Sequence, residues 1–536
     1  MDPFIIYLIL FSIIVLLGQL FQKSTVPVAL ILVILGMVLS FIPFFPETHI
    51  DSKLVLNIFL PLLIYQISSF SSWHDIKKQA RPITILSIGH VFFITLLVAV
   101  VIHALIPQIG WPLAFLLGAI ISPPDDVAIV AIAEKIRIPE RIFLILEGEG
   151  MFNDAAALTL FRFALAAAAT NQFSFIHAFG VFTAVILGET VYGFLLGHLL
   201  GQLRTRITNT KLHVIASFIT PFLAYIPVVE LGGSGIIATA IVGFIMGNEY
   251  TLRFTPEYRL ASLMIWPMLA FAIQTIIFLL VGLNLRSDFI HISSIPLTSL
   301  ALYVTSVIAT VIIGRFIWVY GFVILVPGFI FPFSRKKKTR PWKTSFLVSW
   351  SGVRGGISLA AVLAVPPLTL QIDHIDIRDL LVFIVFCTIF VTLVLQGLSL
   401  PYFLKKMGVD KLGQSERYKE HMNELQARIK MIRAALNWLQ QYKKQMKHDK
   451  KLSSEISMYI YQYELLKRQY EAEVLDHDGK TIYDEEYELK EKLSLLFQIL
   501  EVEKAELARL WSEDKINLKT RNRLVSILDH QIQRYL

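Results

Sequence analysis

The sequence predicts an all-α membrane protein of about thirteen transmembrane helices, arranged as two repeats and followed by a helical cytoplasmic domain. Three observations lead to this prediction. The chain has 536 residues, of which 55% are hydrophobic, and its mean hydropathy is +0.62. Apolar runs of roughly 20 residues, long enough to cross a bilayer, recur up to about residue 408. Beyond that point the composition changes, and about half of all charged residues lie in the last quarter of the chain.

The predicted spans follow one another with short loops between them. They cover residues 4–21, 27–45, 53–70, 82–106, 112–133, 142–169, 176–202, 212–229, 233–248, 260–285, 296–332, 344–366 and 380–404. The first run differs from a secretory signal peptide, because Asp2 stands where a basic residue is expected and no clear cleavage site follows. We therefore expect it to be retained as the first helix.

Lysine and arginine residues alternate between the loops. One set of loops carries Lys77 and the basic clusters at 204–211 and 335–338, whereas the other set is nearly free of them, as at 107–111 and 171–177. Basic loops face the cytoplasm, so the sequence predicts a multi-pass protein of the cell membrane with its N-terminus outside. The net charge of +8 follows from these loops, which meet membrane lipid, and indicates no nucleic-acid partner.

Two domains are predicted, a transmembrane domain at 1–408 and a cytoplasmic helical domain at 409–536. Apolar residues of the second domain recur at helical spacing, and its charges nearly cancel. It has neither a glycine-rich phosphate-binding loop nor a Cys/His metal pattern. Cys387 is the single cysteine, which excludes an intrachain disulfide. We interpret the domain as regulatory or as a dimer contact, with a simple structural appendage as the alternative.

Two predicted spans contain helix breakers in matching places. Residues 122–128 include the pair Pro123–Pro124, and residues 351–356 include three glycines. If the spans on either side of 176–202 form two repeats, both breaks fall in the fifth span of a repeat. Interrupted helices at corresponding positions are typical of the ion site in repeat-built transporters, because the freed backbone and the half-helix dipoles face the site.

Charged side chains lie inside the same spans. A carboxylate inside a span, as at Asp154, costs roughly 2.5–3.5 kcal/mol on insertion scales and marks an ion or proton path. Asp125 follows the double proline, and Asp126 adds an adjacent carboxylate. Glu149 and Asn153 share one helix face. These residues predict that the chain moves a cation across the membrane.

Two arginines are also predicted inside the membrane, Arg315 and Arg354. A buried guanidinium and a buried carboxylate at the same depth pair, since either alone is very unfavourable. We expect Glu149 to pair with Arg315 or Arg354, and the two arginines to be structural charge partners. Asp154 and Asp125 then remain for the transported cation.

In order and on the predicted spans, these motifs resemble those of the monovalent cation/proton antiporters, and most closely the electroneutral sodium/proton exchanger branch. The resemblance covers about residues 5–408 and is carried by these segments: Glu149–Asp154, Pro124–Ala128, Gly352–Gly355, Gly314–Arg315, Glu230–Gly235 and Phe278–Leu283. It implies two inverted repeats with crossed discontinuous helices, a homodimer, and elevator-like movement of one domain against another. It also implies that Asp154 is the transport carboxylate and that one cation exchanges for one proton.

Two departures from the family pattern concern the ion site. Gly150 stands where the family often has serine, which removes one hydroxyl ligand. Asp126 adds a carboxylate beside Asp125, and since neighbouring helical residues point about 100° apart, we expect only Asp125 to face the site. Both departures affect cation selectivity more than mechanism.

The predicted function is exchange of Na⁺ or Li⁺ for H⁺, with no cofactor. Oxygen ligands suit these cations, and we expect them from the following residues, with Na⁺ at Asp154 and Asp125: Asp154, Asn153, Asp125, Glu149, Pro124 and Ser122. Proton and cation then compete for Asp154. K⁺/H⁺ exchange is the near alternative; a cation channel with a regulatory tail and a membrane receptor are more distant ones. An enzyme is not expected.

Overall fold

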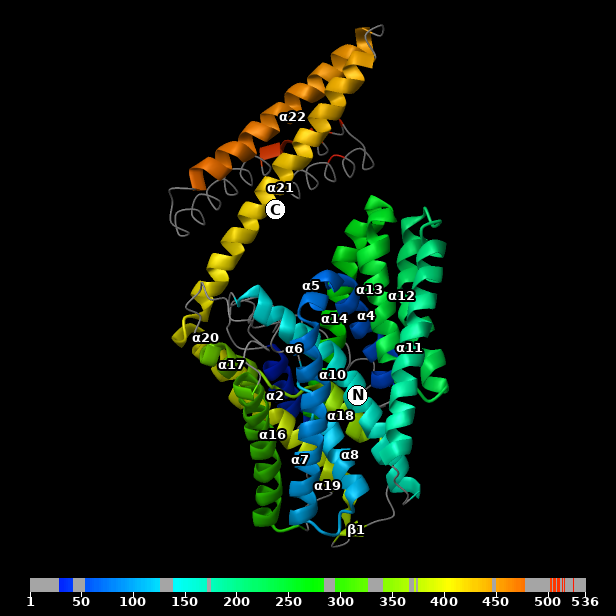
Figure 1. The fold of residues 1–536 in the computed structure, drawn as a ribbon, viewed down its shortest axis with the longest axis vertical. Helices are drawn as coiled ribbons and strands as arrows, with labels where there is room; N and C mark the ends of the chain where they lie inside the picture. Colours follow the sequence, from blue (N-terminus) through cyan, green and yellow to red (C-terminus); the bar gives the residue numbers. More distant parts are fainter. Residues whose placement is uncertain are drawn as a thin grey trace. The chain divides into compact units, whose positions relative to one another are not determined.

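The computed structural model describes residues 28–41, 54–125, 138–170, 175–283, 295–325, 341–365, 371–372, 375–445 and 450–477, with short stretches after residue 501. The chain forms two compact units, Met1–Gly413 and Gln414–Leu536. Nearly all of the described residues are helical (Figure 1). The two described strands, β1 (Gln371–Ile372) and β2 (Ile375–Asp376), form an antiparallel pair that the sequence did not predict.

The elements of the first unit follow the apolar runs. The first half contains α2 (Val28–Ser40), η1 (Val55–Phe59), α4 (Leu60–Phe70), α5 (Trp73–Lys78), α6 (Ala80–Thr84), η2 (Ile85–Gly89), α7 (His90–Leu105), α8 (Trp111–Ile121) and α10 (Glu140–Thr170). The second half contains α11 (Phe175–Arg204), α12 (Thr210–Glu230), α13 (Ile236–Phe244), η3 (Ile245–Tyr250), η4 (Thr251–Arg253), α14 (Pro256–Leu283), α16 (Leu297–Leu325), α17 (Pro341–Trp350), α18 (Gly356–Leu363), α19 (Ile377–Thr392), η5 (Leu393–Gly397) and α20 (Leu398–Lys406).

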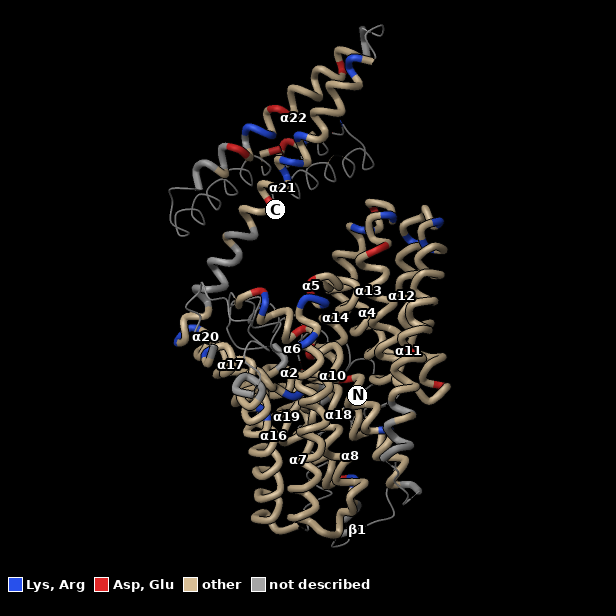
Figure 2. The backbone as a smooth tube through the Cα atoms, viewed as in Figure 1, with Lys and Arg blue, Asp and Glu red and all other residues tan. Residues whose placement is uncertain are grey.

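Each predicted span from 27–45 onward contains at least one of these helices, whereas the span predicted at 4–21 lies outside the described residues. Seven helices in the described part are long and apolar enough to cross a membrane. Figure 2 shows that charged residues are sparse over most of the helical bundle, as expected of helices that cross a membrane. An all-helical membrane protein is therefore confirmed, while the total of about thirteen spans and the inverted repeats remain predictions.

Helix packing divides the first unit into two bundles. We call α2, α4 and α11–α14 the α13 bundle, because these helices pack mainly on one another. The second group, the α10 bundle, comprises α5–α8, α10 and α16–α20. Within the α13 bundle, Gly36 of α2 lies against Gly282 of α14, where a Cβ atom on either residue would collide with backbone of the other helix. Small residues of this kind let membrane helices approach closely.

A buried carboxylate fixes the start of α13. Glu189 of α11 is 2% exposed, and it accepts hydrogen bonds from the backbone N–H groups of Gly235 and Ile237, each at 3.1 Å. Gly235 has a φ of +73°, a conformation that glycine adopts without strain. The negative charge complements the positive end of the helix, so we interpret Glu189 as a structural cap.

The second unit contains two long helices, α21 (Val409–Gln445), which begins in the first unit, and α22 (Lys450–His477). They contact each other through polar side chains: Arg428 donates to the Tyr470 hydroxyl at 3.0 Å, and Arg433 donates to Glu471 at 2.8 Å. These helices lie in the region 409–536 that the sequence predicts to be a separate helical domain, and the boundaries of that domain remain a prediction. Its cytoplasmic location and its role remain predictions.

Candidate functional site

Both helix interruptions predicted from the sequence are present. Helix α8 ends at Ile121, directly before the segment with Pro123 and Pro124, because proline lacks the N–H that continues a helix. Helices α17 and α18 are separated by residues 351–355. The backbone N–H of Asp125 donates to the Val353 carbonyl at 2.7 Å. The two broken segments therefore meet and partly satisfy each other's freed backbone groups.

Position 355 requires glycine because the Asp125 carboxylate lies directly against its backbone. A Cβ atom at position 355 would collide with the Asp125 carboxylate. The half-buried Asp125 therefore lies against the break between α17 and α18. Asp126 lies outside the described residues, so the expectation that only Asp125 faces the site remains a prediction.

Glu149 and Arg315 form a buried ion pair. The guanidinium Nη1 and Nη2 donate to the two carboxylate oxygens at 2.6 and 2.8 Å, and Nε donates to the Val348 carbonyl at 3.0 Å. The side chains are 2% and 1% exposed. Of the two arginines expected to pair with Glu149, Arg315 is thus the partner. Each Glu149 carboxylate oxygen thus accepts one guanidinium hydrogen bond, as expected of a charge partner, and whether Glu149 also contacts the cation remains a prediction.

Arg354 holds the end of the other broken helix. Its Nη1 donates to the Ser122 carbonyl, and its backbone N–H donates to the Thr392 hydroxyl at 3.2 Å. In the part of the chain that the structure describes, its Nε and Nη2 have no hydrogen-bond partner. The Ser122 carbonyl, predicted as a cation ligand, is therefore engaged by a positive side chain.

Asn153 links α10 to the break after α8. Its side-chain nitrogen donates to the Pro124 carbonyl at 2.7 Å, so this predicted ligand is also engaged. Its Oδ1 atom is buried and, among the described residues, accepts no hydrogen bond. Buried acceptors are rarely left without a partner. The side chain thus holds the broken segment through its amide nitrogen, and its oxygen remains a candidate cation ligand.

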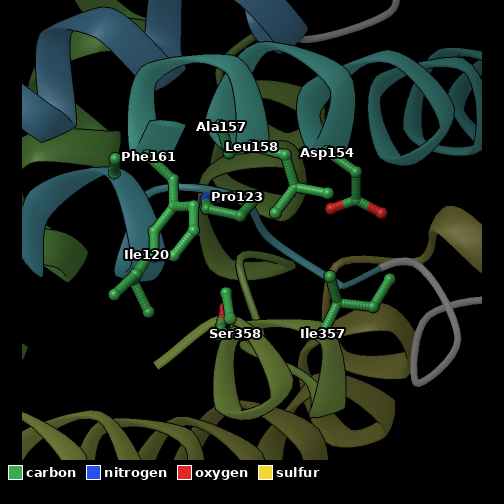
Figure 3. A pocket seen from close by; sticks show the side chains of 10 residues that line it. Ile120, Pro123, Asp154, Ala157, Leu158, Phe161, Ile357 and Ser358 are labelled. Atoms are coloured by element: carbon green, nitrogen blue, oxygen red, sulfur yellow. The ribbon is translucent and has the colours of Figure 1, made fainter. Parts of the chain in front are cut away.

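Asp154 lines a small cavity between α10, α8 and α18 (Figure 3). The volume of about 10 Å³ is close to what one water molecule needs. Pro123, Ile357 and Ser358 also line it. Figure 3 shows the Asp154 side chain projecting from α10 toward the start of α18, where Ile357 lies. The cavity matches the size of one water molecule or one small cation.

One carboxylate near this site was not assigned a role from the sequence. Glu147 precedes Asp154 by about two helical turns, so both lie on one face of α10. It is half-buried and accepts a hydrogen bond from the Ser71 hydroxyl at 2.8 Å. The helical spacing to Asp154 was the signal that could have identified it.

Comparisons with known proteins identify the family of the chain. The family model described as the transmembrane part of sodium/hydrogen exchangers matches residues 8–406. A sodium, potassium, lithium and rubidium/H⁺ antiporter of Bacillus pumilus is 29% identical over 433 residues, covering 77% of this chain and 63% of that relative, which is less than two thirds of its length. An uncharacterized Na⁺/H⁺ exchanger of Mycobacterium tuberculosis is 33% identical over 423 residues, covering 76% of this chain and 74% of the relative.

A solved structure shows the same fold. The sodium proton antiporter MjNhaP1 from Methanocaldococcus jannaschii at pH 8 matches with a TM-score of 0.59 and 17% identity, covering 74% of this chain and 96% of that chain. At this identity the likeness concerns the fold alone.

Proposed function

Since the chain belongs to the sodium/hydrogen exchanger family, we propose that it is a secondary antiporter that exchanges Na⁺ or Li⁺ for H⁺ across the cell membrane. This is a family of transporters, so the prediction that the chain is not an enzyme is confirmed. The observation that carries the proposal is the placement of Asp154, which lines a cavity of about one water beside two broken helices. An intramembrane carboxylate at such a place is a feature of ion pathways.

The charges of the site support exchange of one ion for one proton. The site contains three carboxylates and two guanidinium groups. The carboxylates belong to Glu149, Asp125 and Asp154, and the guanidinium groups to Arg315 and Arg354. Among these described residues one negative charge is left over when all are ionised. A single monovalent cation or a single proton neutralises it. The loaded site is then neutral with either substrate, and electroneutral exchange follows because the unloaded, charged site is costly to move through the membrane.

The cation is held by oxygen atoms. We assign it to the carboxylates of Asp154 and Asp125 and to Oδ1 of Asn153, which has no partner in the described residues. Water would complete the shell, because Gly150 supplies no hydroxyl. The Glu149–Arg315 pair and Arg354 hold α10 and the broken helices in place around these oxygens. A proton on Asp154 removes the charge that binds the cation, so each substrate displaces the other.

Movement between the two bundles would expose the site to alternate sides of the membrane. The interrupted helices and Asp154 all belong to the α10 bundle. We infer an elevator-like displacement of this bundle against the α13 bundle, in a homodimer. We propose from the distribution of basic loops that the N-terminus lies outside the cell and the domain after residue 409 in the cytoplasm.

K⁺/H⁺ exchange is the second candidate. The name of the Bacillus pumilus relative includes potassium and rubidium besides sodium and lithium. Carboxylate and amide oxygens bind any of these cations, and only the size and stiffness of the site distinguish them.

Exchange in proteoliposomes tests the proposal. An imposed pH gradient is dissipated when Na⁺, Li⁺ or K⁺ is added, an internal dye reports the pH, and the membrane potential is clamped or left free. We expect a cation-dependent signal that Asp154→Asn abolishes, whereas Glu249→Gln, at an exposed position of η3, retains it. Correctly inserted Asp154→Asn protein that still exchanges ions would refute the assignment. A signal that depends on the potential would refute electroneutrality.

A further inference from the structure

A second and larger cavity lies between the two bundles, and Asp154 does not line it. Its volume is about 350 Å³, within the roughly 300–1,000 Å³ that ligand pockets occupy. Helices α5, α6, η2 and α10 form one wall, and α11 and α13 form the other. Along α10 it extends from Phe152 to Thr159, which is about 10 Å. The space therefore runs along about two turns of α10.

The walls of this cavity are apolar. Most of the lining side chains are aliphatic or aromatic, among them Ile83, Phe152, Ile237 and Ile241. Three lining hydroxyls donate to the carbonyl of their own helix: Ser87 at 2.8 Å, Thr159 at 2.7 Å and Thr190 at 2.7 Å. Apolar cavities of this kind do not hold ordered water, so the chemistry of the walls fits a hydrocarbon chain.

The end of the cavity at α5 carries a basic and an amphipathic side chain. Lys77 lines it and is exposed, and among the described residues it forms no ion pair, whereas the neighbouring Lys78 binds Asp75 at 2.7 Å. Trp73 lines the same end and is 46% exposed. Tryptophan and lysine together are typical of the membrane–water interface. The basic loop predicts that this end lies in the cytoplasmic leaflet, where anionic lipids concentrate.

We propose that this cavity is a binding site for one anionic phospholipid, with an acyl chain between the α10 and α13 bundles and the phosphate headgroup at Lys77. The apolar walls suit an acyl chain. Lys77, which forms no ion pair among the described residues, attracts an anionic headgroup, and Trp73 indicates that this end lies at the level of the membrane–water interface. A lipid held there lies between the two bundles, so it would also affect their relative movement. The site is independent of the ion site and of the identity of the transported cation.

Native mass spectrometry of the full chain in detergent, titrated with phosphatidylglycerol or with zwitterionic phosphatidylcholine, tests the proposal without any ion gradient. Ile237→Trp fills the cavity and is expected to remove one tightly bound phosphatidylglycerol per protomer. The control Leu187→Trp, at a position 60% exposed on α11 and outside the cavity, retains it. Lys77→Ala is expected to weaken phosphatidylglycerol binding about fivefold and to leave phosphatidylcholine unchanged, whereas Lys78→Ala has a smaller effect.

Three results would overturn the site. Ile237→Trp that keeps the full number of tightly bound lipids would exclude the cavity, and Lys77→Ala with unchanged lipid preference would exclude the headgroup position. If Ile237→Trp does not fold, the wild-type chain with phosphatidylglycerol carrying a photoreactive acyl chain decides: label on α10 and α13 at the cavity supports the site, and label only on the outward faces of α11 and α12 refutes it.

Discussion

The Glu149–Arg315 pair offers the sharpest test of how the site is held together. Replacing Glu149 by leucine leaves a guanidinium 1% exposed that keeps, among the described residues, only the hydrogen bond from Nε to the Val348 carbonyl. Replacing Arg315 by methionine leaves a carboxylate 2% exposed without its two donors. Removal of one partner of a buried pair costs about 3–5 kcal/mol, a large part of the roughly 5–15 kcal/mol that stabilises a folded protein.

The double variant E149L/R315M removes both charges and keeps apolar side chains in their place. Such replacements are often neutral or stabilising, so we expect it to recover most of the free energy of unfolding lost in either single variant. Denaturant unfolding in micelles, followed by circular dichroism, measures the values. The control Glu424→Gln breaks the exposed pair with Arg428 and is expected to cost less than about 1 kcal/mol.

The measured stabilities test whether the pair holds the site together, and the exchange activity of the double variant tests the role of Glu149. If either single variant is within about 1 kcal/mol of the wild type, or if the double variant is no more stable than the singles, the pair does not hold the site as described. When the double variant is stable, its exchange activity decides the role of Glu149. Retained exchange means that Glu149 does not bind the ion, and lost exchange in a folded protein means that at least one member of the pair is needed for transport itself.

Further predictions concern neighbouring residues. Gly355→Ala is expected to displace the Asp125 carboxylate and raise the KM for Na⁺ at least tenfold; an unchanged KM would remove Asp125 from the ion site. Asn153→Ala is expected to weaken cation binding because Oδ1 is lost, and isothermal calorimetry with Na⁺ would detect this; unchanged affinity argues against that ligand. In the second unit, the hydrogen bond from Arg433 lowers the pKa of Glu471, so this contact stabilises the helix pair at neutral pH and is lost as the pH falls through the lowered pKa. Amide exchange of α21 and α22 in the full chain at pH 7 and at a pH below this lowered pKa, corrected for intrinsic rates, should show weaker protection at the lower pH, and Arg433→Gln should reduce the difference.

The elements of the fold were predictable where one-dimensional patterns determine them. Hydropathy located every described span, and the double proline at 123–124 predicted the end of α8. The partner of Glu149 was not predictable, because sequence gives the depth of Arg315 and Arg354 in the membrane but not the direction in which each helix faces. The role of Gly355 was not predictable for a similar reason. A side chain at position 355 would collide with Asp125, which lies far away in the sequence.

Asn153 connects the architecture of the site to its charge. Its nitrogen donates to the Pro124 carbonyl, so an amide here holds the broken segment against α10. An ionised aspartate has no proton to donate, and it would leave that carbonyl without this donor. It would also add a second uncompensated negative charge to the three carboxylates and two arginines at the site. The same side chain thus holds the backbone beside Asp154 and, under the proposed exchange, keeps the excess charge of these residues at one, so that one cation or one proton would neutralise it.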